Sequence, residues 1–217
     1  MKKILLGMTL LSTVAMGAEG TNLYLRAGSD LNEKFDVISS TPTENLNEKK
    51  SHEIGYEIGV EATREVFPNF ELGLGVSYQD HSKPKNKSYK EGNVLTVHKI
   101  PEMRSMPLYV TAKYNIPVNS SIKPYLKADL GYSFNRTNGK YKLTQSNEPK
   151  LDGVYNTDIK NGVYFGIGGG FEYNNITMDL MYKINKAEFE YGKYGTMIKK
   201  DLDYSRITLS GGYKFNF

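Results

Sequence analysis

Cysteine is absent from this chain of 217 residues, and no stretch reaches the ~18 consecutive apolar residues expected of a membrane-spanning helix. Without cysteine an exported protein has no disulfide bonds, so its stability must come from the fold itself. The mean hydropathy of −0.51 likewise excludes a helical membrane protein. Histidine occurs three times, and no metal-ligand spacing, phosphate-binding loop or cofactor motif is present. We therefore expect no metal or other cofactor.

The N-terminus has the layout of a secretory signal peptide. Lys2 and Lys3 precede an apolar run over residues 4–16, and small residues follow at Ala15, Gly17 and Ala18. We predict a signal peptide over residues 1–17, cleaved after Gly17 or Ala18, and one mature domain over residues 18–217. Removal of the two lysines lowers the formal charge from +4 to +2, which is not the balance of a nucleic-acid-binding protein.

Beyond residue 20, apolar and polar side chains alternate with a period of two. In residues 70–79, for example, Phe70, Leu72 and Leu74 alternate with polar residues or glycine. This alternation predicts β-strands with two chemically different faces. The pattern predicts eight strands: 22–29, 53–64, 70–79, 106–114, 123–134, 162–173, 176–185 and 204–217.

The connections between these segments alternate in length. Short connections cover 65–69, 115–122 and 174–175, and long polar connections cover 30–52, 80–105, 135–161 and 186–203. Outer-membrane barrels have short periplasmic turns and longer extracellular loops. We therefore predict an all-β, eight-stranded antiparallel up-and-down transmembrane β-barrel. It has four long extracellular loops, three short periplasmic turns and both termini in the periplasm.

Alternation alone also fits a soluble barrel with an apolar core. Aromatic residues favour the membrane arrangement because they gather at both ends of the apolar face, with aliphatic residues between them. Glycines are frequent on the polar face, as the narrow lumen of an eight-stranded barrel requires. The aromatic residues are, at the turn end, Phe70, Tyr114, Phe171, Tyr173, Phe215 and Phe217, and at the loop end, Tyr78, Tyr132, Phe134, Phe165 and Tyr182.

Residues 106–114, 124–132 and the C-terminal strand resemble small outer-membrane barrels of the OmpX, OmpA membrane-domain and opacity-type families. The final Tyr213, Phe215 and Phe217 are similar to the assembly signal of these families. The resemblance implies an outer-membrane location and recognition by the barrel-insertion machinery. The peptidoglycan-binding domain of full-length OmpA relatives has no counterpart after Phe217, so we do not carry that tethering role over.

The polar face of the predicted strands balances six basic against six acidic side chains. A buried charge is unfavourable unless it is paired, so this balance predicts a salt-bridged interior that fills the barrel. The alternative interpretation is a path for ions or protons. The residues are Arg26, Glu57, Glu61, Glu71, Lys113, Lys127, Asp129, Glu172, Asp179, Lys183, Arg206 and Lys214.

Enzymatic activity is the competing class of function. Small barrels that modify lipid A need a nucleophile, a base and an orienting acid within reach of one another. His52 lies at a predicted strand rim, whereas His81 and His98 fall in the second long loop, where we expect solvated side chains. We therefore expect no enzyme. A narrow pore for small solutes, as in OmpW-like barrels, is the runner-up, but it would need an apolar lumen.

The second and third long loops carry an excess of lysine and arginine. Ordinary solvated loops of a lysine-rich chain are the favoured interpretation, and the functional hypothesis is that Lys83, Lys85, Lys87 and Lys90 contact lipopolysaccharide phosphates or an anionic host or bacterial surface. The sequence thus predicts a structural or surface-interaction protein, adhesion-like in role, whose partners are outer-membrane lipid, lipopolysaccharide and surface ligands.

Overall fold

The computed structural model describes residues 20–37, 54–81, 87–91, 94–99, 102–138, 141–145, 153–155, 157–193 and 196–217. Within these ranges the chain forms β-strands and their connections. The predicted signal peptide lies outside the described residues. No helix in the described ranges is long and apolar enough to cross a membrane.

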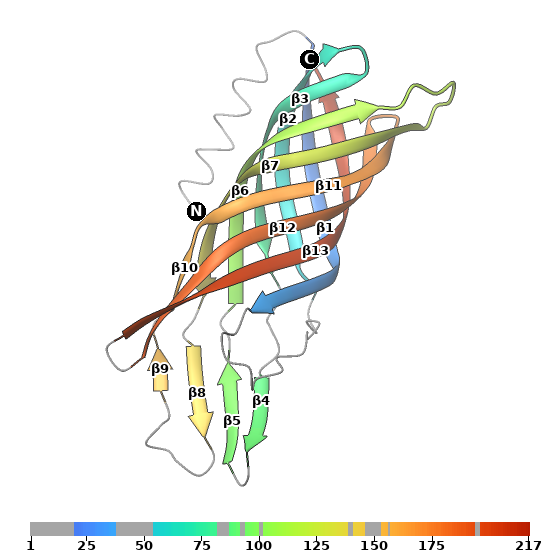
Figure 1. Cartoon of the computed structure of the whole chain (residues 1–217). Coiled ribbons are helices and arrows are strands. Elements are labelled where there is room, and N and C mark those ends of the chain that lie inside the picture. Colours follow the sequence, from blue (N-terminus) through green and yellow to red (C-terminus); the bar gives the residue numbers. More distant parts are fainter. Residues whose placement is uncertain are drawn as a thin grey trace.

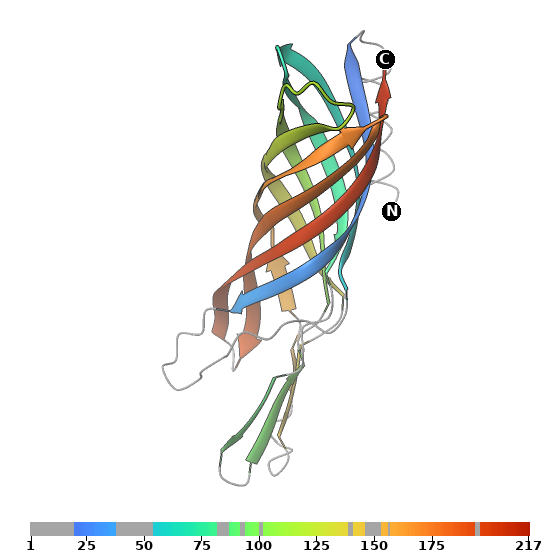
Figure 2. The same cartoon turned by 90° about the vertical axis from the view of Figure 1, so that its right-hand side faces the viewer.

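Eight long antiparallel strands close into a barrel. Each strand pairs with its neighbour in chain order, and the first strand also pairs with the last, from Asn22↔Asn216 onward, which closes the ring. Figures 1 and 2 show the tilted strands arranged around one barrel axis. The eight strands are β1 (Thr21–Val37), β2 (Tyr56–Phe67), β3 (Phe70–Asp80), β6 (Glu102–Asn115), β7 (Lys123–Asn138), β11 (Gly162–Tyr173), β12 (Ile176–Lys193) and β13 (Thr196–Asn216).

The eight-stranded barrel confirms the predicted fold class, and the strands overlap all eight predicted segments. They differ mainly at the loop end, where several run farther than the apolar alternation does. The segment 186–203, predicted as one of the long polar loops, consists mostly of strand. β12 and β13 continue as paired strands up to Lys193↔Thr196, because backbone pairing does not require an apolar outer face once the wall has left the lipid.

Asparagine shapes two of the three tight turns. Asn174 and Asn175 have φ angles of 47° and 66°, as a two-residue turn with both central residues in the left-handed region requires. Asn69 has a φ of 65°, and its backbone N donates a 2.7 Å hydrogen bond to Glu65. Asparagine tolerates this conformation better than other non-glycine residues, so these turns set the register of the strands that they join.

The second and third long connections form a sheet of their own. It consists of β4 (Lys87–Glu91), β5 (Val94–Lys99), β8 (Tyr141–Gln145) and β9 (Gly153–Tyr155) in that order. β5 comes from the second connection and β8 from the third, so their pairing ties the two connections together. Figure 1 shows this sheet beyond the loop end of the barrel.

A β-bulge interrupts the wall where β10 (Thr157–Lys160) meets β11. Both strands pair with β12, but three residues lie between Lys160 and Tyr164 while only two lie between their partners Glu188 and Asn185. The extra residue inverts the alternation. As a result Ile159 is buried inside the barrel and Lys160 is exposed on its outer face.

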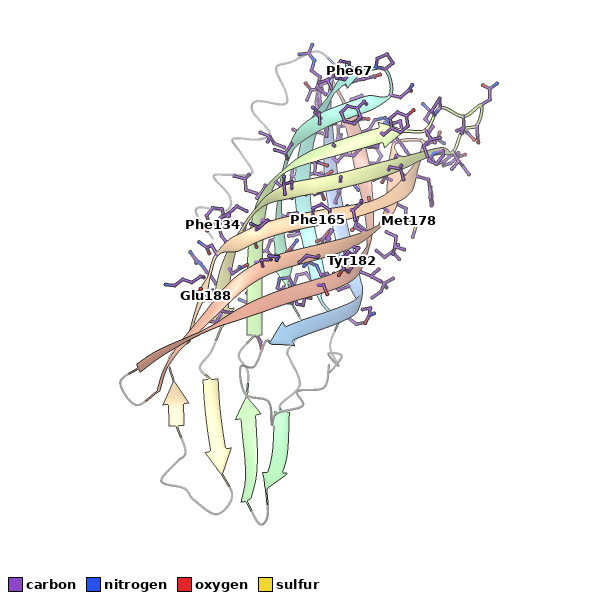
Figure 3. All side chains as sticks on the ribbon, in the orientation of Figure 1. Phe67, Phe134, Phe165, Met178, Tyr182 and Glu188 are labelled. Carbon is purple, nitrogen blue, oxygen red and sulfur yellow. The ribbon has the colours of Figure 1, made fainter. Side chains whose placement is uncertain are left out.

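The two faces of the wall have opposite chemistry. Figure 3 shows the side chains of the barrel with Phe134, Phe165, Met178 and Tyr182 labelled, all four of them exposed. The inner face is mostly polar and buried, and glycine makes room for larger side chains there. A Cβ on Gly75 would lie 2.4 Å from the ring of Tyr109, so this close approach needs glycine. The barrel is therefore inside-out relative to a soluble protein.

Candidate functional site in the barrel interior

The structure places all twelve charged residues singled out from the sequence on the inner face of the wall. Eleven are buried, and Lys214, near the turn end of β13, is partly exposed. They come from strands all around the ring, so ion pairs cross the lumen, as between Glu61 and Lys127, as well as join neighbouring strands, as between Arg26 and Glu61. The charges form three connected groups along the barrel.

The middle group is centred on Glu61 of β2. One Glu61 oxygen accepts from Arg26 Nε at 2.8 Å, and the other accepts from Tyr109 at 2.9 Å and pairs with Lys127. Arg26 also pairs with Asp179 of β12, past the intervening strand β13, and Lys127 Nζ lies 3.7 Å from Asp129. Glu61 thus connects β1, β2, β6 and β7 through one carboxylate.

The group at the turn end is centred on Lys113 of β6. Its Nζ lies 3.0 Å from Glu172 and 3.6 Å from Glu71. Glu172 also accepts from Lys214 at 2.6 Å, and Tyr24 donates to Glu71 at 3.0 Å. The Lys113 ammonium lies over the Tyr24 ring at 4.9 Å, a cation–π contact that adds to the ion pairs.

The third group lies toward the loops and includes a residue that sequence reasoning missed. Glu57 pairs with Lys183 and lies 3.7 Å from Arg206, and Arg206 lies 3.4 Å from Asp30. Asp30 had been assigned to the first loop, but β1 continues past it, and its carboxylate is buried. Extending the alternation of Asn22, Tyr24, Arg26 and Gly28 by one step would have found it.

Together these groups occupy the interior of the barrel from its turn end toward its loop end. A buried ion pair is stable only when its geometry is good and its remaining polar atoms are satisfied. Buried tyrosines, asparagines and glutamines supply many of those bonds, as when Gln79 donates to Glu57 and Arg206 donates to Asn185. An eight-stranded barrel has a lumen just wide enough for side chains to fill, and here ion pairs fill it.

His81 caps the ionic groups at the loop end, and the expectation that it is a solvated loop residue is wrong. Its side chain is 1% exposed, its ring lies 4.2 Å from the Tyr204 ring, and its Nε2 lies 2.8 Å from Ser105 Oγ. Tyr204 belongs to an apolar cluster with Met103, Ile159 and Ala187. The apolar contacts therefore cover the charged interior on the side of the loops.

The pairing of His81 with Ser105 lacks the geometry of a nucleophile and its base. Ser105 donates its own proton to Asn135 Oδ1 at 2.8 Å, so the hydroxyl accepts from the imidazole instead of giving its proton to it. His81 Nδ1 has no hydrogen-bond partner, so no acid orients the ring, and Ser105 is 2% exposed. The pair therefore holds β3 and β6 together and is not poised for acyl transfer.

Burial lowers the pKa of His81 well below its usual range, and the nearby Arg206 guanidinium lowers it further. His81 follows the last residue of β3, beyond the aromatic ring of Tyr78, and so lies outside the membrane-spanning segment. The imidazole is consequently neutral at neutral pH, which suits a buried group beside a tyrosine ring and near a guanidinium.

The outer face carries the aliphatic belt between two rings of aromatic residues. Leu74, Leu130 and Leu180 are about half exposed, which suits a surface in contact with lipid. Aromatic residues border this belt at the turn end with Tyr114, Phe171, Tyr173, Phe215 and Phe217, and at the loop end with Tyr132, Phe134, Phe165 and Tyr182.

The remaining residues singled out from the sequence lie at the two ends of the barrel. Tyr213 and Phe215 face outward on β13, and Phe217 N donates to Thr21 O at 3.0 Å beside the closing strand pair. Lys87 and Lys90 belong to β4 of the projecting sheet. Lys83, Lys85 and His52 lie outside the described residues.

Comparison with known proteins agrees with this geometry. The family model of the outer membrane protein beta-barrel domain matches residues 4–215. The chain belongs to this family. It is a protein of the bacterial outer membrane. The match confirms the resemblance to small outer-membrane barrels that was inferred from the sequence.

Individual relatives are similar over nearly their whole length. An uncharacterised protein of Pasteurella multocida is 31% identical over 99% of this chain and 98% of its own. Among solved structures, the outer membrane protein OprG of Pseudomonas aeruginosa is 14% identical, with a TM-score of 0.56 over 92% of this chain and 97% of that one. The neisserial surface protein NspA is 16% identical, with a TM-score of 0.46 over 92% and 99%. At these identities the structural likenesses concern the fold alone.

We predict that Glu61→Gln strongly destabilises the barrel. The substitution removes the shared counter-charge of Arg26 and Lys127, and breaking a buried ion pair typically costs about 3–5 kcal/mol. Urea unfolding of the protein folded in lipid vesicles measures the loss. The control is Asp80→Asn, which breaks the rim pair with Arg104, whose side chain is 42% exposed, and is expected to cost less than about 1 kcal/mol. Equal losses for the two variants would contradict a stabilising interior network.

We also predict that His81 makes the barrel less stable in mild acid. The unfolded chain binds a proton at His81 near pH 6.5, whereas the folded protein does so only at much lower pH. The free energy of unfolding therefore falls as pH decreases from 7 to 5, by up to about 1.4 kcal/mol per pH unit. The change His81→Gln flattens this dependence, and His98→Gln serves as the matched control. Parallel pH profiles for the wild type and His81→Gln would disprove the prediction.

Proposed function

We propose that the protein is a closed outer-membrane barrel that presents its long connections at the cell surface, as a non-catalytic structural and surface-interaction protein. The ion-paired interior is the observation that carries this proposal. The side chains of Arg26, Glu61, Lys127 and their neighbours fill the interior. Such a barrel suits a rigid support for the long connections at its loop end better than it suits a channel for solutes. The loop end then faces outward, and both termini face the periplasm.

The four-stranded sheet supports a role in surface contacts. Its strands hold four lysines, Lys87, Lys90, Lys99 and Lys142, against the single acid Glu91. Lys99 and Lys142 are direct register partners in the pairing of β5 with β8. Four basic residues against one acidic residue give these strands a net positive charge, so the sheet suits an anionic bacterial or host surface.

A narrow pore for small solutes is the second candidate. The apolar cluster of Met103, Ile159, Ala187 and Tyr204 is its support, because it shows that the lumen is not charged along its whole length. The ionic groups between this cluster and the turn end argue against a continuous apolar path. Catalysis has less support, since Ser105 donates to Asn135 and is buried.

The absence of cysteine makes the orientation testable with single-cysteine variants. Thr144 in β8 and Ser120 in the connection between β6 and β7 are both exposed and lie at opposite ends of the barrel. We expect a membrane-impermeant maleimide to label Thr144→Cys on intact cells, and Ser120→Cys only after the outer membrane is permeabilised. The wild type is the unlabelled control. The reverse pattern would show that the loop end faces the periplasm.

Conductance separates the closed barrel from the pore. Purified protein inserted into planar lipid bilayers should produce no large, steady single-channel currents, because ion pairs fill the lumen. A porin of 16 or more strands, whose lumen is an aqueous channel, provides the positive control. Steady currents from the wild-type protein would overturn the closed interior and favour the pore.

A further inference from the structure

Three basic side chains form a row on the outer face of the wall at the loop end. They are Arg104 of β6, Arg136 of β7 and Lys160 of β10, and the structure exposes all three to different extents. Arg104 and Arg136 are direct register partners. Lys160 follows on the next strand, where Asn135 Nδ2 donates to its carbonyl oxygen at 3.2 Å. The row therefore crosses three adjacent strands.

The bulge at Asn161 creates the third member of this row. Without the extra residue, the alternation of β11 would turn position 160 toward the lumen. Asn135 N donates to the Asn161 side chain at 2.9 Å, which joins the bulged segment to β7 beside Arg136. A structural irregularity thus places a cation outside the barrel that regular pairing would have turned inward.

In the described part of the chain, acidic residues lie beside the two outer members of the row. Asp80 lies 3.0 Å from Arg104 Nε on one side, and Glu188 is the register partner of Lys160 on the other. Glu102 lies on β6 two residues from Arg104 and faces Asn138 of β7. Among the described residues, Arg136 has no acidic partner within ion-pair distance, although Arg104 lies directly opposite. Such facing like charges are unfavourable unless an anion joins them.

The depth of the row indicates where that anion comes from. Arg136 lies two residues beyond Phe134 on the same face of β7, about 7 Å along the strand at the usual rise per residue. Figure 3 shows Phe134 and Glu188 on the outer side of the wall toward the loop end. Aromatic rings in this position mark the boundary of the hydrocarbon layer. The row therefore lies at the level of the lipid headgroups.

We infer that Arg104, Arg136 and Lys160 form a binding site for a phosphate group of lipid A, the anchor of lipopolysaccharide. The guanidinium fork of Arg136 can hold two phosphate oxygens, and its neighbours add charge from both sides. The assignment rests on the proposed orientation, because lipid A occupies the outer leaflet. The acyl chains of the same lipid then lie against the exposed Leu108, Leu130 and Phe165 below the row.

Binding of lipid A to the purified, folded protein in neutral detergent tests the site. The probes are bisphosphorylated lipid A, the same lipid without phosphates, and phosphatidylglycerol, each measured by native mass spectrometry. We expect the bisphosphorylated form to bind best and to bind more weakly as salt rises. The double variant Arg104→Gln/Arg136→Gln should bind about tenfold more weakly for each arginine lost, because each substitution removes a charge-assisted contact to the phosphate.

The matched control is Arg64→Gln, an exposed arginine on β2 near the opposite end of the barrel. It should bind lipid A like the wild type, and the double variant should keep the wild-type unfolding curve in urea. Equal binding of the double variant and the wild type would overturn the proposal. So would equal binding of dephosphorylated lipid A or phosphatidylglycerol by the wild type. These results are independent of cysteine labelling, which alone tests the orientation.

Discussion

Every backbone N–H and C=O group in a bilayer needs a hydrogen-bond partner within the protein, and closure of the sheet is what supplies it here. The decisive contact is the pairing of β1 with β13, which removes the two edges that an open eight-stranded sheet would expose. Phe217 extends this closure through its hydrogen bond to Thr21 at the end of the last strand. Once the ring is closed, alternate side chains must point to lipid or to the lumen.

The narrowness of the closed ring restricts which side chains can point into its interior. The lumen of eight strands is too small for bulk water, so charged residues facing inward must find partners among themselves. Glu61 illustrates the solution, because one carboxylate serves Arg26, Lys127 and Tyr109 from three other strands. Glycine residues provide the space that this charge pairing needs. Gly75 leaves room for the Tyr109 ring, and that ring brings its hydroxyl to Glu61. Packing and charge pairing are thus parts of one arrangement.

Most of the architecture was predictable because period-two alternation is a local property of the chain. The eight strands, the short turns at Asn69 and Asn174–Asn175, and the positions of the inward charges all follow from residues close in sequence. The alternation predicted the strand ends less well where the wall extends beyond the lipid. There the outer face is polar, so the continuation of β1 past Asp30 and of β12 past Asn185 carried little apolar signal.

The sequence by itself determined that this chain forms a barrel with an apolar exterior, because that information lies in the spacing of neighbouring residues. Only the tertiary structure decided which charges meet, since Arg26 and Asp179 are separated by 153 positions and meet only because β1 and β12 both pair with β13. The tertiary structure also buries His81, which the sequence placed in a solvated loop. One extra residue at Asn161 places Lys160 on the outer face of the wall. Such contacts depend on closure and register, which are properties of the whole ring and of no single segment.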